Sequence, residues 1–132
     1  EIYPDVDLLI IDRENELVKA IFSCKTSLRE RLTETAFWKR ELERNNKTRE
    51  VKLIFITTNK DDELQQENNR YMIHHVLDCT FVTDPKKYEE LMKCYEKRYR
   101  RKEGYAELML KIKPVKEIKN FLKELTKSLK QP

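Results

Sequence analysis

The sequence predicts an α/β fold, in which a mixed sheet carries helices on its faces. Apolar runs of strand length alternate with longer amphipathic stretches along the chain. The first two apolar runs are joined by a few polar residues, and so short a connection favours an antiparallel hairpin. The third run, residues 51–57, is apolar almost throughout, as expected of a strand that is covered on both faces. Together these observations place helices on both sides of one sheet.

The individual elements are expected in the following order. Residues 6–11 and 17–24 form the two strands of the hairpin. Ser27 caps a helix that runs to about Arg44, and Glu30 completes a capping box. The strand over 51–57 is followed by a helix over 61–72, a strand over 76–83 and a helix that begins at Asp84-Pro85. Gly104 ends that helix, residues 106–112 alternate as a strand does, and Pro114 opens a last helix.

Length and charge limit the class of protein. At 132 residues the chain is expected to form one domain over 1–132. It has 28 basic and 24 acidic residues, for a net charge of +4. So small an excess is expected of an ordinary solvated surface and not of a polycation that coats nucleic acid. The chain opens at Glu1 almost directly on a strand, so we expect it to be part of a longer protein whose leading elements precede it.

The three cysteines indicate the compartment. Cys24 and Cys79 lie in apolar runs and are expected to be buried free thiols, and no C-x-x-C pair indicates a zinc site. Free thiols fit a reducing cytoplasm. No apolar run is long enough to cross a membrane. The expected location is therefore the cytoplasm.

The hairpin carries the residues with chemistry. Asp5 and Asp7 lie at the start of the first strand, where they share a face, and Lys25 lies at the end of the second, two residues after Ser23. Carboxylates bind hard divalent cations, and such a cation polarises a phosphate and acidifies a water molecule. A lysine supplies a point charge for the attacking water or the developing negative charge. The pattern is that of a Mg²⁺-dependent phosphodiesterase site.

The segment Lys25-Thr26-Ser27-Leu28-Arg29-Glu30-Arg31 and the preceding Pro4-Asp5-Val6-Asp7 resemble the PD-(D/E)XK nucleases, and among them the type II restriction endonucleases. The general pattern of that superfamily has an acid where Ser23 stands. In a subgroup that cuts CCGG-like and related sites, the strand reads Ser-x-Lys and the second acid lies on the following helix. The resemblance implies a restriction-endonuclease-like core, Mg²⁺ as cofactor, double-stranded DNA as substrate, a homodimer and a prokaryotic source.

The resemblance leaves the second acid open. The position that carries it in the subgroup is Trp38 here. Glu30, Glu34 and Glu41 lie on one side of the predicted helix, opposite its main apolar stripe. Glu34 is the first choice, because Glu30 also belongs to the capping box and Glu41 is farther along the helix. The implied site is Asp7 and Asp5 with Glu34 as metal ligands, and Lys25 as the catalytic cation.

Basic residues beside this site are the candidates for DNA binding. Arg29, Arg31, Lys39 and Arg40 are expected to hold phosphates, although a solvated helix face would have the same composition. A second basic run over 97–102 could follow a DNA backbone. Tyr95 and Tyr99 are interleaved with it, but their spacing with Leu91 is that of core residues, so we expect them in the core rather than stacked on bases. The polar stretch from Asn59 to Arg70 is expected to be a solvated helix.

Two other functions stay open. A repair or Holliday-junction nuclease on the same fold would share the site but recognise the structure of its substrate. A catalytically inactive DNA-binding domain would account for Ser23 and for Trp38 at the acid position. His74-His75 is expected in a turn or interface rather than in a metal site, and Phe37 and Trp38 in the core or a dimer contact.

Overall fold

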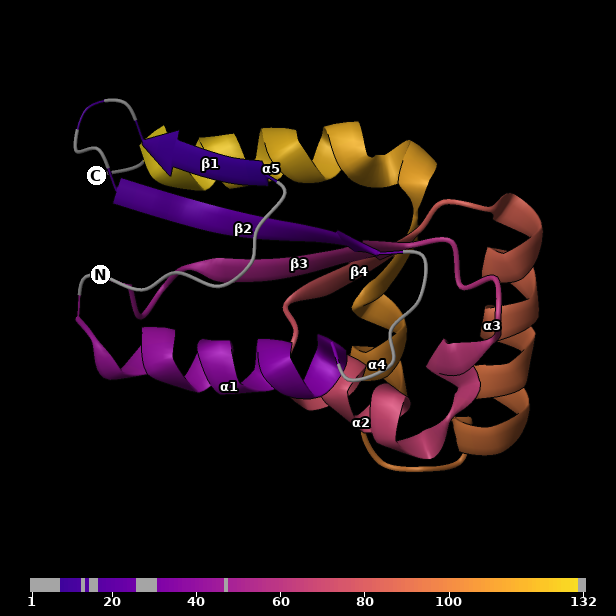
Figure 1. The fold of residues 1–132 in the computed structure, drawn as a ribbon. Helices are drawn as coiled ribbons and strands as arrows, with labels where there is room; N and C mark the ends of the chain where they lie inside the picture. Colours follow the sequence, from indigo (N-terminus) through magenta and orange to yellow (C-terminus); the bar gives the residue numbers. More distant parts are fainter. Residues whose placement is uncertain (1–7, 13, 15–16, 26–30, 47, 131–132) are drawn as a thin grey trace.

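The computed structural model describes residues 8–12, 14, 17–25, 31–46 and 48–130, without the side chains of Lys25, 31–36 and 126–130. Five strands form one sheet, and Figure 1 shows helices on both of its sides. The strands are β1 (Leu8–Asp12), β2 (Leu17–Lys25), β3 (Lys52–Thr57), β4 (Cys79–Val82) and β5 (Ile112–Pro114). The helices are α1 (Arg31–Arg44), α2 (Glu67–His75), α3 (Pro85–Tyr99), α4 (Tyr105–Leu110) and α5 (Ile118–Lys130), with single 3₁₀ turns at η1 (Glu63–Gln65) and η2 (Val115–Glu117).

The strand order in the sheet follows the chain order, β1-β2-β3-β4-β5. β1 and β2 are antiparallel and form the predicted hairpin, with Leu8 opposite Phe22. β2, β3, β4 and β5 are mutually parallel, so helices must return the chain between them. The carboxyl ends of the parallel strands therefore lie along one edge of the sheet. The mixed α/β architecture is as the sequence predicted.

Alternation along the strands produces a core on each face of the sheet. One face packs α1 to α4 against Ile21, Leu53, Phe55, Val82 and Ile112, with Tyr95 as the largest fully buried side chain. The opposite face presents Ala20, Phe22, Ile54, Cys79 and Phe81 to α5, which covers them with Ile118, Phe121, Leu122 and Leu125. In Figure 1 α5 lies above the sheet and α1 below it. The two cores explain why β2, β3 and β4 are apolar on both sides.

Local sequence signals explain several boundaries. The carboxylate of Asp84 accepts hydrogen bonds from the backbone N–H groups of Lys86 (2.9 Å) and Lys87 (3.4 Å), and Pro85 occupies the first turn of α3. Gly104 has φ 84°, a left-handed conformation, and begins α4. A Cβ atom at Gly104 would lie 2.8 Å from Cε1 of His74. The structure confirms the helix start at Asp84-Pro85 and the break at Gly104.

Three predicted elements were wrong in type or extent. Residues 106–112 form mostly helix α4, and only Ile112 begins a strand, because alternation over so few residues does not separate a strand from a helix with one buried side. The helix predicted over 61–72 is divided into η1 and α2, which extends to His75. The strand predicted over 76–83 is only β4, four residues long. The predicted cap at Ser27 lies outside the described residues.

Two burial predictions were also wrong. Cys24 is exposed, because it lies next to the end of β2 and belongs to neither of the two buried clusters. Cys79 is buried, as predicted. Asn59, expected on a solvated helix, is 3% exposed and lies in a turn with φ 55°. Phe37 is 57% exposed, so of its two predicted places the core is excluded and the dimer contact stays a prediction.

Candidate active site at the carboxyl edge of the sheet

The predicted site residues are only partly within the described chain. Asp5, Asp7, Arg29 and Glu30 lie outside the described residues. The backbone of Lys25 is described as the last residue of β2, and those of Arg31 and Glu34 lie in the first turn of α1. Lys39, Arg40 and Glu41 are described with their side chains. What the structure defines is therefore the frame around the predicted site.

The position of Lys25 is set by strand pairing. Lys25 is the register partner of Thr57, the last residue of β3, and Thr57 in turn pairs with Val82, the last residue of β4. Because the three strands are parallel, their carboxyl ends meet at this edge. In open α/β sheets ligands bind outside these carboxyl ends. Lys25 therefore lies at the edge of the sheet where folds of this kind bind their ligands.

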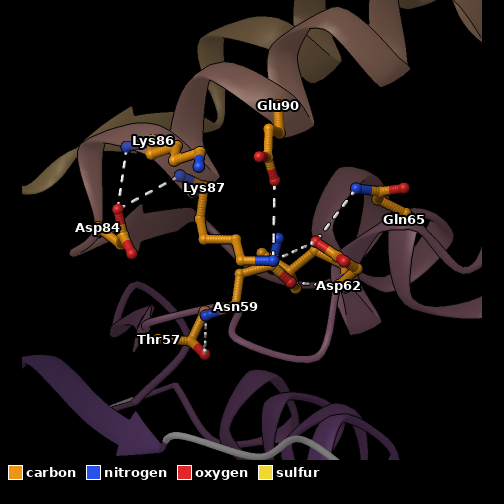
Figure 2. Close-up of polar contacts among 9 residues, drawn as sticks. Thr57, Asn59, Asp62, Gln65, Asp84, Lys86, Lys87 and Glu90 are labelled. Carbon is orange, nitrogen blue, oxygen red and sulfur yellow. Dashed lines mark hydrogen bonds and ion pairs between the residues drawn. The ribbon is translucent and has the colours of Figure 1, made fainter.

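The turn after β3 forms one side of this edge. The buried side chain of Thr57 accepts a hydrogen bond at Oγ1 from the backbone N–H of Asn59 (3.1 Å), as Figure 2 shows. Oδ1 of Asn59 accepts the backbone N–H of Leu64 (3.0 Å), and the carbonyl of Asn59 accepts that of Asp62 (3.1 Å). Asn59 and Asp62 both have positive φ. Asn59 makes these three bonds with its backbone N–H, its side-chain oxygen and its carbonyl. It therefore fixes the turn beside Thr57, the register partner of Lys25.

Two acidic residues at this edge, Asp62 and Asp84, have protein partners. Figure 2 shows Asp62 between Gln65 and Lys87, with Oδ1 3.3 Å from Nε2 and 3.1 Å from Nζ respectively. The hydrogen bond to Asp62 raises the pKa of the Lys87 ammonium, which also lies 3.7 Å from Glu90. Asp84 caps α3. These contacts tie η1 to the start of α3.

The axis of α1 separates the candidate second acids. Glu34 lies in the first turn of α1, which follows the end of β2 after five residues, whereas Glu41 lies two turns later. Seven residues of α-helix correspond to about 10 Å along the axis. The carboxylate of Glu41 lies 3.4 Å from the guanidinium of Arg44. Along the helix, Glu34 is thus nearer than Glu41 to the end of β2.

Lys39 has protein partners in the structure. Its ammonium donates to Oδ2 of Asp78 (2.9 Å) and to the carbonyl of Val51 (3.3 Å), and its side chain is only 13% exposed. The same Asp78 oxygen accepts the backbone N–H of Leu53 (2.7 Å). These contacts lie at the amino ends of β3 and β4, away from the edge where β2 ends. The ammonium of Lys39 is thus engaged within the protein, whereas the side chain of Arg40 is exposed.

The histidine pair lies elsewhere, beside α4. His74 is buried, stacks on His75 with ring centroids 4.0 Å apart, and places Nε2 3.6 Å from Glu107. Burial, followed by repulsion from His75, lowers the pKa of His74. Within the described ranges no three His, Cys, Asp or Glu side chains are grouped to hold a metal ion. No helix in the described part of the chain has the length and apolarity needed to span a membrane.

A mixed five-stranded sheet flanked by helices, with a hairpin leading into its parallel strands, defines a restriction-endonuclease-like fold. The structure is similar to that of PspGI in the restriction endonuclease PspGI–substrate DNA complex, with a TM-score of 0.66 and 17% identity, over 83% of this chain and 41% of that one. The family model described as BsaWI restriction endonuclease type 2 matches residues 1–106. The chain belongs to this family of type II restriction endonucleases.

Two curated relatives agree with this family. A probable type II restriction enzyme of Helicobacter pylori, HpyAORF263P, is 40% identical over 63 residues, which is 48% of this chain and 33% of the relative. A putative type II restriction enzyme of Methanocaldococcus jannaschii, MjaVIP, is also 40% identical over 63 residues, or 46% of this chain and 28% of the relative. The chain thus spans about a third of the length of the curated relatives it matches.

Proposed function

We propose that this chain carries the catalytic core of a Mg²⁺-dependent type II restriction endonuclease, which hydrolyses phosphodiester bonds at a specific site in double-stranded DNA. The observation that carries the proposal is the pairing of Lys25 with Thr57, which puts the lysine at the carboxyl edge of the sheet. The first turn of α1 follows after residues 26–30. The family match and the Ser-x-Lys pattern support the same assignment.

In this proposal Asp7, Asp5 and Glu34 would hold the metal ion. Carboxylate oxygens are the ligands that Mg²⁺ prefers. When bound, Mg²⁺ supplies a Lewis acid for the scissile phosphate. The ammonium of Lys25 orients the attacking water and stabilises negative charge as it develops on the phosphate. Lys25 is held at this place by the parallel pairing of β2 with β3.

Binding of the DNA backbone near the scissile bond is assigned to Arg29, Arg31 and Arg40. Arginine donates in a fork that fits phosphate oxygens, and such contacts position the duplex without reading its sequence. Lys39 is left out of this set, because its ammonium already contacts Asp78 and Val51 and has a structural role. The active assembly is proposed to be a homodimer, because a two-fold protein matches a palindromic site.

Digestion of a panel of plasmid and phage DNAs with Mg²⁺ tests the function. Discrete fragments that are lost without the divalent ion are expected. A junction nuclease would leave linear duplexes intact and cut four-way junctions. A DNA-binding domain that has lost its activity, which Ser23 would favour, would shift DNA in a gel without cutting any of it.

The second acid is tested by a matched pair of variants. Glu34→Ala is expected to abolish cleavage, whereas Glu41→Ala removes only an ion pair with Arg44 on the helix surface and should cut normally. The reverse result would assign the acid to Glu41. Loss of activity in neither variant would move the assignment to Glu30.

A further inference from the structure

The end of α3 carries a concentrated positive charge that the proposed site does not use. An open hollow of about 850 Å³ is lined there by Lys93, Glu96, Lys97, Arg98, Arg100, Arg101 and Lys102, which we call the α3 basic patch. Six cations and one carboxylate leave an excess of five positive charges, against a net charge of +4 for the entire chain. The other residues of the chain therefore sum to a net charge of −1, and the net positive charge of the protein is accounted for by this patch.

Three of these cations form a row. Lys93, Lys97 and Arg101 are four residues apart, so they follow one side of α3 and its continuation, and all three are exposed. The row makes no ion pair with any residue that the structure describes, whereas Arg100 lies 3.6 Å from Glu96. Like charges at this spacing repel and weaken a helix. Although a helix C-terminus attracts cations, stability of α3 does not explain a row this long.

Two other cations of the patch, Arg98 and Lys102, contact the protein. Arg98 donates to the carbonyl of Gln65 (2.7 Å), and Lys102 lies over the ring of Tyr99, 5.4 Å from its centroid. Tyr99 donates to Glu67, and Tyr95 donates to the carbonyl of Leu64, so both tyrosines are buried with their hydroxyls engaged. Because the aromatic rings are not available for stacking on bases, the patch offers charge alone. That chemistry suits the phosphates of a backbone rather than bases.

We propose that the α3 basic patch binds the phosphate backbone of the same duplex that the catalytic edge holds, independently of sequence. This inference rests on the proposed function, since it identifies a second contact for that substrate. α3 begins at the carboxyl edge and has 15 residues, so its far end lies about 20 Å away, or roughly six base pairs along a duplex. The row spans about 12 Å, which covers three to four phosphates of one strand.

Salt-dependent binding tests the proposal. A fluorescent random-sequence duplex is titrated in EDTA, so that no DNA is cut, at several salt concentrations. The triple variant Lys93→Gln/Lys97→Gln/Arg101→Gln is expected to lower the slope of log K against log salt by about 2 to 3, or roughly 0.9 for each phosphate that is no longer neutralised. The matched control is Lys116→Gln/Lys119→Gln/Lys123→Gln, which removes the same charge from exposed positions on and before α5, the helix that packs on the other face of the sheet from α3. The control slope should stay near that of the wild type.

Each outcome decides the proposal. An unchanged slope in the row variant, or equal reductions in the two triple variants, would overturn it. Polyglutamate is titrated as a second ligand. If it binds as tightly as the duplex and the triple row variant weakens both equally, the row binds an acidic protein partner and the proposal is wrong. Thermal unfolding of both variants ensures that weaker binding does not result from unfolding. A protein whose slope falls in the row variant but which never cuts DNA would support the patch and refute only the proposed function, whereas normal cleavage with an unchanged slope would refute only the patch.

Discussion

The ammonium of Lys39 in α1 lies 2.9 Å from the carboxylate of Asp78, which itself accepts the backbone N–H of Leu53. One carboxylate thus joins a helix to the first residues of two neighbouring strands. Both side chains are mostly buried, at 13% and 25% exposure. The ion pair therefore holds α1 against the amino ends of β3 and β4.

Lys39→Gln is expected to reduce the free energy of unfolding by about 1 to 3 kcal/mol, because it leaves a partly buried carboxylate without its charged partner. Arg40→Gln, at the next and exposed position, should change it by no more than about 0.5 kcal/mol. Urea unfolding of the two variants measures the difference. Equal midpoints would mean that the Lys39–Asp78 contact does not stabilise the fold.

Gly104→Ala is expected to destabilise the protein by more than about 1 kcal/mol, because φ is 84° and the new Cβ atom meets His74. The double variant Gly104→Ala/His74→Ala removes the clash but retains the backbone cost. In chemical unfolding, Gly104→Ala should therefore cost less free energy of unfolding in the His74→Ala background than in the wild type. Additive effects would show that the clash contributes nothing.

The stability of the fold should depend on the protonation of His74. Burial lowers the folded pKa of His74 below its ordinary value of 6.5, so the unfolded chain binds the proton more readily. The contribution of His74 is complete above pH 6.5 and is lost as the pH falls through the folded pKa. Urea midpoints between pH 7.5 and 5.5 should fall less steeply for His74→Gln than for the wild type. Parallel curves would contradict this role, and exposed His75 provides the control substitution.

The thiols should react at different rates. Cys24 is exposed, whereas burial raises the pKa of Cys79 to about 11 and keeps it from forming the nucleophilic thiolate. A thiol reagent should modify Cys24 within the folded protein and Cys79 only after unfolding. Mass spectrometry of the modified peptides identifies the order. Rapid modification of Cys79 in the folded state would contradict the packing of α5 on the sheet.

Local patterns made much of the fold predictable. The hairpin follows from two apolar runs with a short connection, and the start of α3 follows from Asp84-Pro85, which needs no distant contact. The tyrosine stripe of α3 was predicted to be core, and Tyr95 and Tyr99 are buried. Residues 106–112 were predicted wrongly because Leu108 and Leu110 alternate in sequence, yet only Leu108 is buried and Leu110 is 72% exposed.

Features that depend on distant parts of the chain were not predictable. The burial of Asn59 results from the turn between β3 and η1, and the partner of Lys39 lies 39 residues away. The exposure of Cys24 depends on how the helices pack over the end of β2, which the apolar run does not specify. The sequence pattern named Lys25 as the catalytic cation, but its neighbour across the sheet, Thr57, is determined by parallel pairing alone.

The central claim is that the carboxyl end of β2 carries the catalytic lysine. Its most direct test is the single-turnover rate of DNA cleavage with Mg²⁺, measured for Lys25→Ala and for Lys52→Ala, an exposed lysine at the opposite, amino end of β3. We predict that the rate falls at least about 100-fold for Lys25→Ala, with DNA binding and the unfolding midpoint retained, and that it stays normal for Lys52→Ala. A folded Lys25→Ala variant that cuts at the wild-type rate would contradict the claim.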